Sequence, residues 1–377
     1  MKIDKTGYLI VWLVVLLTGL GSLSAEAQLA GAVVGWGDTR YGQCKVPAGL
    51  NGVIAVAAGA YHTVALKYDG TVIAWGSNGF DLNITPVGLD GVIAIASGDY
   101  HAVALKSNGI VVAWGKNDSG QCNVPAGLNN VIAVAAGSSH TVVLKSNGTV
   151  VAWGDNGFGQ CIIPTGLNGV TAISAYGSRT AALKSDGTIV AWGDNRFGAG
   201  NAPAGLTGVI AIAVGGSHMV ALKSNGIVVA WGNNFYGQCD VPIGMNGVTA
   251  IVAGFLHTAA LKSDGTVFAW GENRWGQCNV PADMKAIALS AGLFHTVAIL
   301  WTDLYVEGTS GNDTTGNGSP TKPFKTLTKA LSQPYVRRIF MRAGNYGMDK
   351  LPALPRITKQ VQLINWGNIG SARIGKP

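Results

Sequence analysis

The sequence predicts an all-β protein, a seven-bladed β-propeller of 39-residue repeats closed by an N-terminal strand, followed by a small C-terminal α/β or β-helix-like segment. Three observations lead to this fold: a constant repeat length, short β-branched runs separated by glycine turns, and incomplete repeats at both ends that complement each other. The composition agrees, since 55 of the 377 residues are glycine and only 12% are charged. Such a chain suits many tight turns and disfavours both long exposed helices and charge-driven disorder.

The first residues have the features of an export signal. Lys2 and Lys5 precede the apolar run 9–20, and the triplet 25–27 (Ala-Glu-Ala) fits a cleavage site with small residues. This pattern is typical of a secretory signal peptide, so we expect residues 1–27 to be removed and the protein to be secreted or periplasmic. A membrane anchor is the alternative, but the run is shorter than the roughly 20 residues of a spanning helix. We expect no membrane span in the mature chain.

The repeat itself occupies residues 28–302. One copy contains four runs, 131–137, 140–145, 149–154 and 160–164, which we name strands a, b, c and d. Asn-Gly or Asp-Gly between strands b and c suits a tight hairpin turn, and four strands per roughly 40 residues are typical of one propeller blade. Strand c ends on a Trp-Gly pair in every copy, and we expect the tryptophan side chains to pack between blades. They are Trp36, Trp75, Trp114, Trp153, Trp192, Trp231 and Trp270.

The two ends of the repeat predict how the ring closes. The first copy consists of strand c alone, residues 33–37, and the last copy stops after strand b, residues 295–300. We therefore expect the N-terminal strand to complete the seventh blade, which leaves no long unpaired edge. An open β-solenoid is the alternative, but it would not need complementary ends. Strand a is rich in alanine and glycine, so we place it innermost, where the ring is most crowded.

The motif WG-x-N-x-x-GQ-C-x-VP-x-GL, followed by AG-x-x-H-x-x-AL-K-S-(N/D)-G-x-x-x-AWG, resembles the repeat of the regulator of chromosome condensation family. The resemblance covers residues 33 to about 300. The short, uniform copies are most similar to the secreted bacterial branch, which includes propeller-type β-lactamase inhibitory proteins. This implies a bacterial, exported, non-enzymatic protein that binds a protein partner, with an exported enzyme as one candidate. The eukaryotic founder is a guanine nucleotide exchange factor for a nuclear GTPase, an activity that does not suit an exported chain.

The polar residues of the repeat predict structural roles and no catalysis. A zinc ion needs three or four ligands around one point, whereas the histidines lie one to a blade, so we expect no metal and no cofactor. We expect each histidine to be satisfied by a neighbouring loop backbone and to brace adjacent blades. The five cysteines share one column, and we expect free thiols. No carboxylate pair or nucleophile motif indicates an enzyme. The histidines are His62, His101, His140, His218, His257 and His295, and Arg179 takes the remaining place.

The variable residues gather in two sets of loops. Because strands alternate in direction, the a–b and c–d loops emerge on one face, which we name the loop face. Aromatic and arginine side chains are typical anchors of protein interfaces, so we predict a protein-binding site there. The aromatic column five residues after each tryptophan fits packing on its own blade as well as exposure. The predicted site comprises Arg40, Tyr61, Tyr100, Arg196, Phe235, Phe255, Arg274, Trp275 and Phe294.

Residues 303–377 differ from the ring. We expect a short helix over 323–331 and two strands near 337–347 and 357–367. The pattern YV-x(5)-GND followed by PFKT-x-x-x-AL resembles the start of right-handed parallel β-helix proteins, many of which act on polysaccharides. This favours carbohydrate or cell-surface binding as an alternative function. The formal charge of +7 lies wholly in this segment, since residues 1–302 contain 15 basic and 15 acidic residues. The ring is neutral, so we expect a monomer that binds no nucleic acid.

Overall fold

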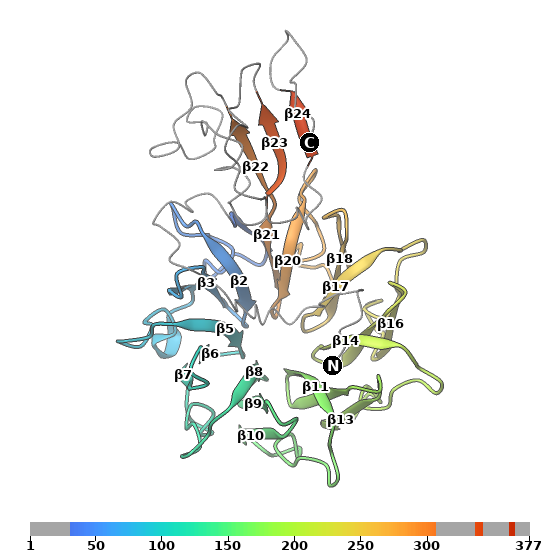
Figure 1. Cartoon of the computed structure of the whole chain (residues 1–377). Coiled ribbons are helices and arrows are strands. Elements are labelled where there is room, and N and C mark those ends of the chain that lie inside the picture. Colours follow the sequence, from blue (N-terminus) through green and yellow to red (C-terminus); the bar gives the residue numbers. More distant parts are fainter. Residues whose placement is uncertain (1–30, 307–335, 342–361, 366–377) are drawn as a thin grey trace, which may run out of the picture. The chain divides into compact units, whose positions relative to one another are not determined.

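In the computed structural model of the chain, seven three-stranded sheets are arranged in sequence order around a common centre (Figure 1). The structure describes residues 31–306, 336–341 and 362–365. The predicted signal peptide and the expected helix over 323–331 lie outside these ranges. Neighbouring strands of the blades pair antiparallel, as when His140 lies opposite Gly154 and Ala136 opposite Thr141. The predicted seven-bladed propeller is confirmed.

Each blade consists of an inner, a middle and an outer strand, which correspond to strands a, b and c. In chain order, blade 1 is β2 (Val53–Ala58), β3 (His62–Lys67) and β4 (Val72–Gly76), blade 2 is β5 (Val92–Ser97), β6 (His101–Lys106) and β7 (Val111–Gly115), and blade 3 is β8 (Val131–Ala136), β9 (His140–Lys145) and β10 (Val150–Gly154). Blade 4 is β11 (Val170–Tyr176), β12 (Arg179–Lys184) and β13 (Ile189–Gly193), and blade 5 is β14 (Val209–Val214), β15 (His218–Lys223) and β16 (Val228–Gly232). Blade 6 is β17 (Val248–Ala253), β18 (His257–Lys262) and β19 (Val267–Gly271).

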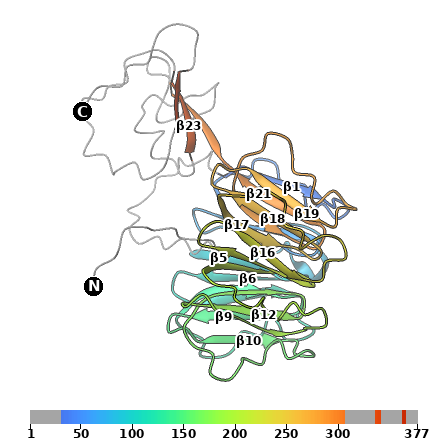
Figure 2. The ribbon, with the colours of Figure 1, turned by 90° about the vertical axis from the view of Figure 1, so that its right-hand side faces the viewer.

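Blade 7 joins the two ends of the repeat, as the sequence predicts. Its inner and middle strands are β20 (Ala286–Ala291) and β21 (His295–Leu300), and its outer strand is β1 (Val33–Gly37) from the other end of the chain. Figure 2 shows the blue β1 among the orange strands of the last blades. Trp36 of β1 is buried, packs with Leu261 and Val267 of blade 6, and donates its indole N–H to the carbonyl of Gln277 at 3.0 Å. The closing strand is therefore part of the hydrophobic core.

The hydrophobic core lies between successive blades. One cluster combines Val103 and Val111 of blade 2 with Val134 and Val143 of blade 3, and Trp153 packs against it. The inner strands surround a central cavity of about 200 Å³, lined largely by alanine, valine and isoleucine. The placement of the alanine-rich strand innermost is confirmed. Small side chains are needed there because seven strands approach one axis.

The predicted fourth strand of each blade is wrong. The segment after β1 forms successive turns, in which Gly42 N–H donates to Thr39 and Lys45 N–H donates to Gly42, both at 2.9 Å. Gly42 has a positive φ of 78°, and the side-chain oxygen of Gln43 accepts a bond from the Tyr41 amide. These local bonds occupy backbone groups that a strand would direct toward a partner. Each blade therefore ends in a compact c–d loop.

In six of the seven blades, a glycine at the end of the inner strand makes room for the histidine of the same blade. A Cβ atom at Gly98 would overlap the ring of His101 and the carbonyl oxygen of Gly137 in the next blade. The same overlap recurs with His140 at Gly137 and with His257 at Gly254. In blade 4 the histidine is replaced by Arg179, and there the glycine is replaced by Tyr176. Glycine and histidine thus occur together for a steric reason.

We expect Gly98→Ala to destabilise the ring by about 1–3 kcal/mol, the usual cost of forcing an extra methyl group into a packed core. Gly157→Ala is the matched control, because a Cβ there meets only the Asp155 side chain, at 3.6 Å, and the backbone needs no positive φ. Denaturant titration of both variants, followed by tryptophan fluorescence, measures the difference. Equal midpoints for the two variants would contradict the steric argument.

The described residues from Leu300 onward belong to a second compact unit. Its described strands β22 (Thr302–Val306), β23 (Val336–Met341) and β24 (Gln362–Asn365) form a parallel sheet in that order. The two strands predicted in this segment are therefore present. No helix in the described part of the chain is long and apolar enough to cross a membrane.

Candidate functional site

Backbone hydrogen bonds tie the a–b loop to the c–d loop in every blade. In blade 7 the amide of Asp38 donates to the carbonyl of Phe294 at 2.9 Å, and in blade 2 that of Lys116 donates to Tyr100 at 2.8 Å. The other five blades repeat this bond, so variable residues of both loops lie side by side. This is the arrangement that the alternating strand directions predict for the loop face.

A series of residues crosses the loop face over blades 6, 7, 1 and 2 in two sets of aromatic and cation–π contacts, which the chain neighbours Arg40 and Tyr41 join. We name it the aromatic arc. Going from blade 6 to blade 2, it comprises Phe255, Phe294, Trp275, Arg40, Tyr41, Tyr61, Tyr100, Phe80 and Lys116. Ring centroids are 4.6 Å apart for Tyr41 and Tyr61, and 6.0 Å apart for Tyr61 and Tyr100. Separations in this range are those of interacting aromatic pairs.

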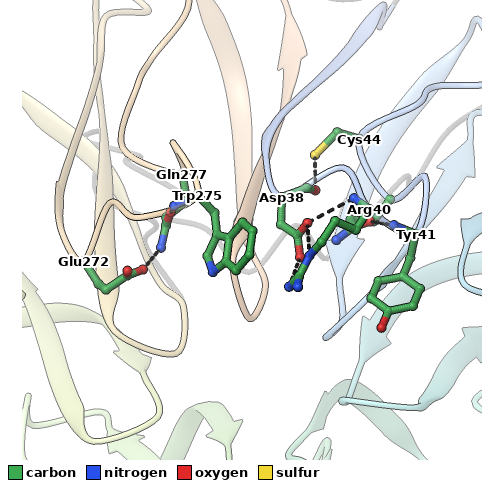
Figure 3. A network of polar contacts seen from close by, with 8 residues as sticks. Asp38, Arg40, Tyr41, Cys44, Glu272, Trp275 and Gln277 are labelled. Atoms are coloured by element: carbon green, nitrogen blue, oxygen red, sulfur yellow. Dashed lines mark hydrogen bonds and ion pairs between the residues drawn. The ribbon is translucent and has the colours of Figure 1, made fainter.

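Arg40 lies where the two sets of contacts meet, next to Tyr41 in the chain, and its position is held from two sides (Figure 3). Its guanidinium lies 3.8 Å from the centroid of the Trp275 ring and forms a bidentate pair with Asp38, with both bonds at 3.0 Å. Burial alone would raise the pKa of Asp38, but the hydrogen bonds and charge of Arg40 lower it below the ordinary value. The Arg40 side chain remains half exposed, whereas the carboxylate of Asp38 is fully covered. It is therefore a preoriented cation at the surface.

The same arrangement of acid and arginine occurs in two other c–d loops. Arg196 forms a bidentate pair with Asp194, and Arg274 lies 3.9 Å from Glu272, which also accepts a hydrogen bond from Gln277. Both arginines are well exposed. Arg274 precedes Trp275 of the arc, whereas Arg196 lies over the ring of Phe158, at 4.9 Å. The acid two residues before each arginine thus fixes where the charge is presented.

Six of the nine residues predicted from the sequence meet in the aromatic arc. These are Arg40, Tyr61, Tyr100, Phe255, Trp275 and Phe294. Arg274 lies next to them in the chain, but Arg196 and Phe235 lie on blades 4 and 5. Phe235 packs against Tyr236 at 5.1 Å, and among the described residues no ring contact joins these two to the arc.

Several residues of the loop face were not among the predicted site residues, or were left undecided between packing and exposure. Tyr41 and Phe80 are about half exposed and belong to the arc, as does Lys116. Asp99 lies in the a–b loop of blade 2, and Tyr176 lines the central cavity. Tyr176 and Lys116 differ in type from the other residues of their repeat columns, which is the signal that could have identified them.

The loop face is divided into two unlike halves. Blades 6, 7, 1 and 2 carry the aromatic arc, whereas the a–b loops of blades 3, 4 and 5 carry only small residues. These include Ser138, Ser139, Gly177, Ser178, Gly216 and Ser217. On blades 3, 4 and 5 the exposed aromatic rings of the described residues belong to the c–d loops, namely Phe158, Phe197, Phe235 and Tyr236.

The histidines are fully buried and connect adjacent blades through side chains. Nε2 of His140 lies 2.9 Å from the Thr180 hydroxyl of the next blade, and that hydroxyl donates to the carbonyl of Gln160. The sequence led us to expect loop backbone as the direct partner, but a threonine hydroxyl is the partner of five histidines and the Ser97 hydroxyl is the partner of His62. Burial lowers the pKa of these rings to about 3 or 4. They are neutral at pH 7, and the described residues contain no group of ligands able to hold a metal ion.

Blade 4 departs from this pattern. Arg179 replaces the histidine, is fully buried, and donates through Nε to the carbonyl of Asp194 at 2.7 Å. Met219 stands where the threonine of the next blade would accept its bond. Burial lowers the pKa of Arg179, although nearby Asp194 opposes the shift. The interface between blades 4 and 5 therefore lacks the histidine–threonine contact of the neighbouring interfaces.

The cysteines are free thiols, as the sequence predicts. They are partly buried, and each S–H donates to a carbonyl of its own c–d loop, as from Cys44 to Asp38 at 3.2 Å. Burial raises their pKa to about 11 or 12. They are therefore protonated and poorly nucleophilic at neutral pH.

Comparison with known proteins places the repeat in a family. The model of the regulator of chromosome condensation (RCC1) repeat matches residues 53–81, 92–121, 131–160, 170–199, 209–238 and 248–277. No curated protein matches the sequence. Among solved structures, Prp20p of Saccharomyces cerevisiae is similar with a TM-score of 0.61 at 19% identity, covering 72% of this chain and 92% of that one. Human WBSCR16 gives 0.62 at 19% identity, covering 72% and 100%.

A receptor-kinase ectodomain has a similar structure as well. The ectodomain of CR4 from Physcomitrella patens gives a TM-score of 0.55 at 25% identity, covering 64% of this chain and 68% of that one.

Proposed function

We propose, from the premise that this chain is a propeller of the RCC1 repeat family, that it is a protein-binding scaffold whose binding site is the aromatic arc of the loop face. Propellers of this family generally bind proteins or act as exchange factors. The carrying observation is that two sets of aromatic contacts lie over four successive blades and meet at the chain neighbours Arg40 and Tyr41, with Arg40 stacked on Trp275. Aromatic residues and arginine are the side chains that dominate binding energy at protein interfaces.

The arc is also preorganised for binding. Arg40 is held by Asp38, and the rings of Tyr41 and Tyr61 restrict each other. Side chains ordered before binding lose less entropy when a partner arrives. Because the ring is neutral, we expect association to depend only weakly on salt.

The test is affinity capture from the exported fraction of the source organism, with partners identified by mass spectrometry. The wild-type chain is compared with the double variant Tyr41→Ala/Phe255→Ala, in which both side chains are exposed and belong to the arc. We expect retention of the specific partner to fall at least about tenfold, as when interface anchors are truncated.

The matched control is Lys145→Ala/Lys223→Ala, which alters the b–c turns at the other end of the strands. It should retain the partner like the wild type. Equal retention by the arc variant and the wild type would overturn the assignment of the face. Retention of this chain itself on a glycan-coated resin would instead favour the second candidate, carbohydrate binding. The exposed ring of Tyr41 also supports that candidate.

The partners of Prp20p are not transferred to this chain. That protein is described by its binding to Gsp1p and histones, and yeast RCC1 by its complex with Kap60. At 17–19% identity the structural similarity supports a shared fold and not shared partners. We propose that this chain is exported, as residues 1–27 predict, and N-terminal sequencing of the mature protein tests this.

A further inference from the structure

The buried guanidinium of Arg179 in blade 4 has two terminal nitrogens without a partner. The Arg179 residue is 1% exposed, and its Nε donates to the backbone carbonyl of Asp194 at 2.7 Å. Among the described residues, no group forms a hydrogen bond with the buried Nη1 and Nη2 atoms. The carboxylate of Asp194 instead forms a bidentate pair with Arg196. Arg179 is therefore a buried cation whose strongest donors are unused within the described part of the chain.

An arginine at this position cannot avoid its charge. The histidines that occupy the same position in the other six blades are equally buried, but burial lowers their pKa to about 3 or 4 and leaves them neutral. A guanidinium, by contrast, stays protonated in proteins. A buried charge without a partner is strongly destabilising. The exchange of histidine for arginine in blade 4 therefore calls for a compensating negative charge.

A third buried donor without a partner comes from the facing strand. Tyr176 and Arg179 are direct partners in the antiparallel register of β11 and β12, on either side of the turn at residues 177–178. Side chains of directly opposed residues project from the same face of a sheet, with their Cβ atoms about 4.5–5.5 Å apart. The Tyr176 hydroxyl is buried, and no described residue bonds to it. The end of this hairpin thus carries both Nη atoms and a phenol hydroxyl, all buried and all able to donate.

The surroundings of this hairpin end offer few acceptors from blade 5. Tyr176 packs against a hydrophobic cluster that includes Val214 and Met219 of that blade. Met219 stands where five of the seven blades have a threonine hydroxyl, and a thioether is only a weak acceptor. An apolar environment strengthens the attraction between a charged donor and an anion. These donors therefore match the chemistry of a small ligand that is negatively charged and accepts hydrogen bonds.

We infer that Arg179 and Tyr176 form an internal binding site for one small anion, either a halide ion or the carboxylate of a small acid. The two terminal nitrogens of a guanidinium suit the paired oxygens of a carboxylate, and a halide accepts from the same donors. The phenol hydroxyl supplies a further bond. A bound anion stabilises the folded ring, because the unfolded chain does not hold these donors together. The site does not depend on the proposed binding of a protein at the aromatic arc.

The test titrates the full chain with chloride or formate, each replacing gluconate at constant ionic strength. Gluconate is the reference because it is too bulky for a buried site. We expect urea midpoints, followed by tryptophan fluorescence, to rise saturably with at least one of the two anions. The line width of the chloride NMR resonance measures chloride binding directly. Tighter binding of formate than of chloride would assign the site to a small organic acid, and the reverse order would assign it to a halide.

Three variants locate the binding. Arg179→Gln keeps a donor for the carbonyl of Asp194 but removes the charge, so it should weaken anion binding at least about tenfold. Tyr176→Phe removes only the hydroxyl and should weaken binding by a smaller factor. The triple variant Tyr176→Gly/Arg179→His/Met219→Thr gives this interface the glycine, histidine and threonine of its neighbours. Its midpoint should not respond to chloride or formate beyond the response of gluconate.

Lys223→Gln is the charge-matched control, because it removes one positive charge from the b–c turn of blade 5. It should bind the anions like the wild type. The inference is overturned if neither anion raises the wild-type midpoint saturably, which is also the result expected if water alone satisfies these donors. It is likewise overturned if Arg179→Gln binds like the wild type, or if the triple variant responds as strongly as the wild type.

Discussion

Lowering the pH from about 7.5 to about 5.5 should strongly destabilise the ring, because six histidines are buried in the neutral form. Burial lowers their pKa to about 3 or 4, whereas an unfolded histidine titrates near 6.5. Between these values the unfolded chain binds protons that the folded ring excludes. The stabilisation is therefore complete above about pH 6.5 and is lost as the pH falls toward 4.

The expected effect is large because the six sites act together. Each contributes roughly 1 kcal/mol per pH unit inside this window, so all six amount to on the order of 6–8 kcal/mol per unit. That is comparable to the total stability of a typical domain. Denaturant midpoints measured by tryptophan fluorescence at several pH values give the slope.

A single substitution provides the control for this slope. His140→Gln keeps a group that can bond to the hydroxyl of Thr180 but removes one titrating site. We expect the dependence of stability on pH to fall by about one sixth in this variant. Midpoints that do not change between about pH 7.5 and 5.5 would show that the buried histidines do not exclude protons.

Removing the N-terminal strand should open the ring. A chain that begins at Thr39 lacks β1, so blade 7 retains β20 and β21 alone, and β21 becomes an unpaired edge. The loss of buried Trp36 by itself is worth about 3–5 kcal/mol, judged from large-to-small substitutions in cores. An exposed strand edge also pairs readily with other chains. We expect a lower denaturant midpoint and self-association, measured by light scattering.

Complementation in trans makes the test specific for closure. A peptide of residues 31–38 should restore the midpoint and the monomer, since it supplies β1. The same peptide with Trp36→Ala should restore much less, because it lacks both the packing against Leu261 and the bond to Gln277. A truncated chain that stays monomeric with an unchanged midpoint would refute closure by β1.

The prediction of four strands per blade failed for a local reason. Strand d was inferred from apolar residues around the cysteine and proline columns, and the spacing of these residues fits a strand. The Gln43 side chain, however, bonds to the amide of Tyr41, and the Cys44 thiol bonds to the carbonyl of Asp38. Side-chain bonds to nearby backbone favour turns over ladders, and periodicity alone does not report them.

The sequence by itself determined the repeat, the number of blades, the closing strand and the face on which the variable loops gather. These follow from patterns that recur along the chain, since a constant period places equivalent residues at equivalent positions of a ring. It also nominated most of the aromatic arc, because aromatic residues in variable loops stand out against a uniform repeat.

Only the tertiary structure decided which of those residues meet. Arg40 and Trp275 are far apart in sequence, yet closure of the ring stacks one on the other at 3.8 Å. Phe235 and Arg196 are also an aromatic residue and an arginine, but they lie on other blades. The repeat places residues within a blade, whereas contacts between non-neighbouring blades exist only once the ring has closed.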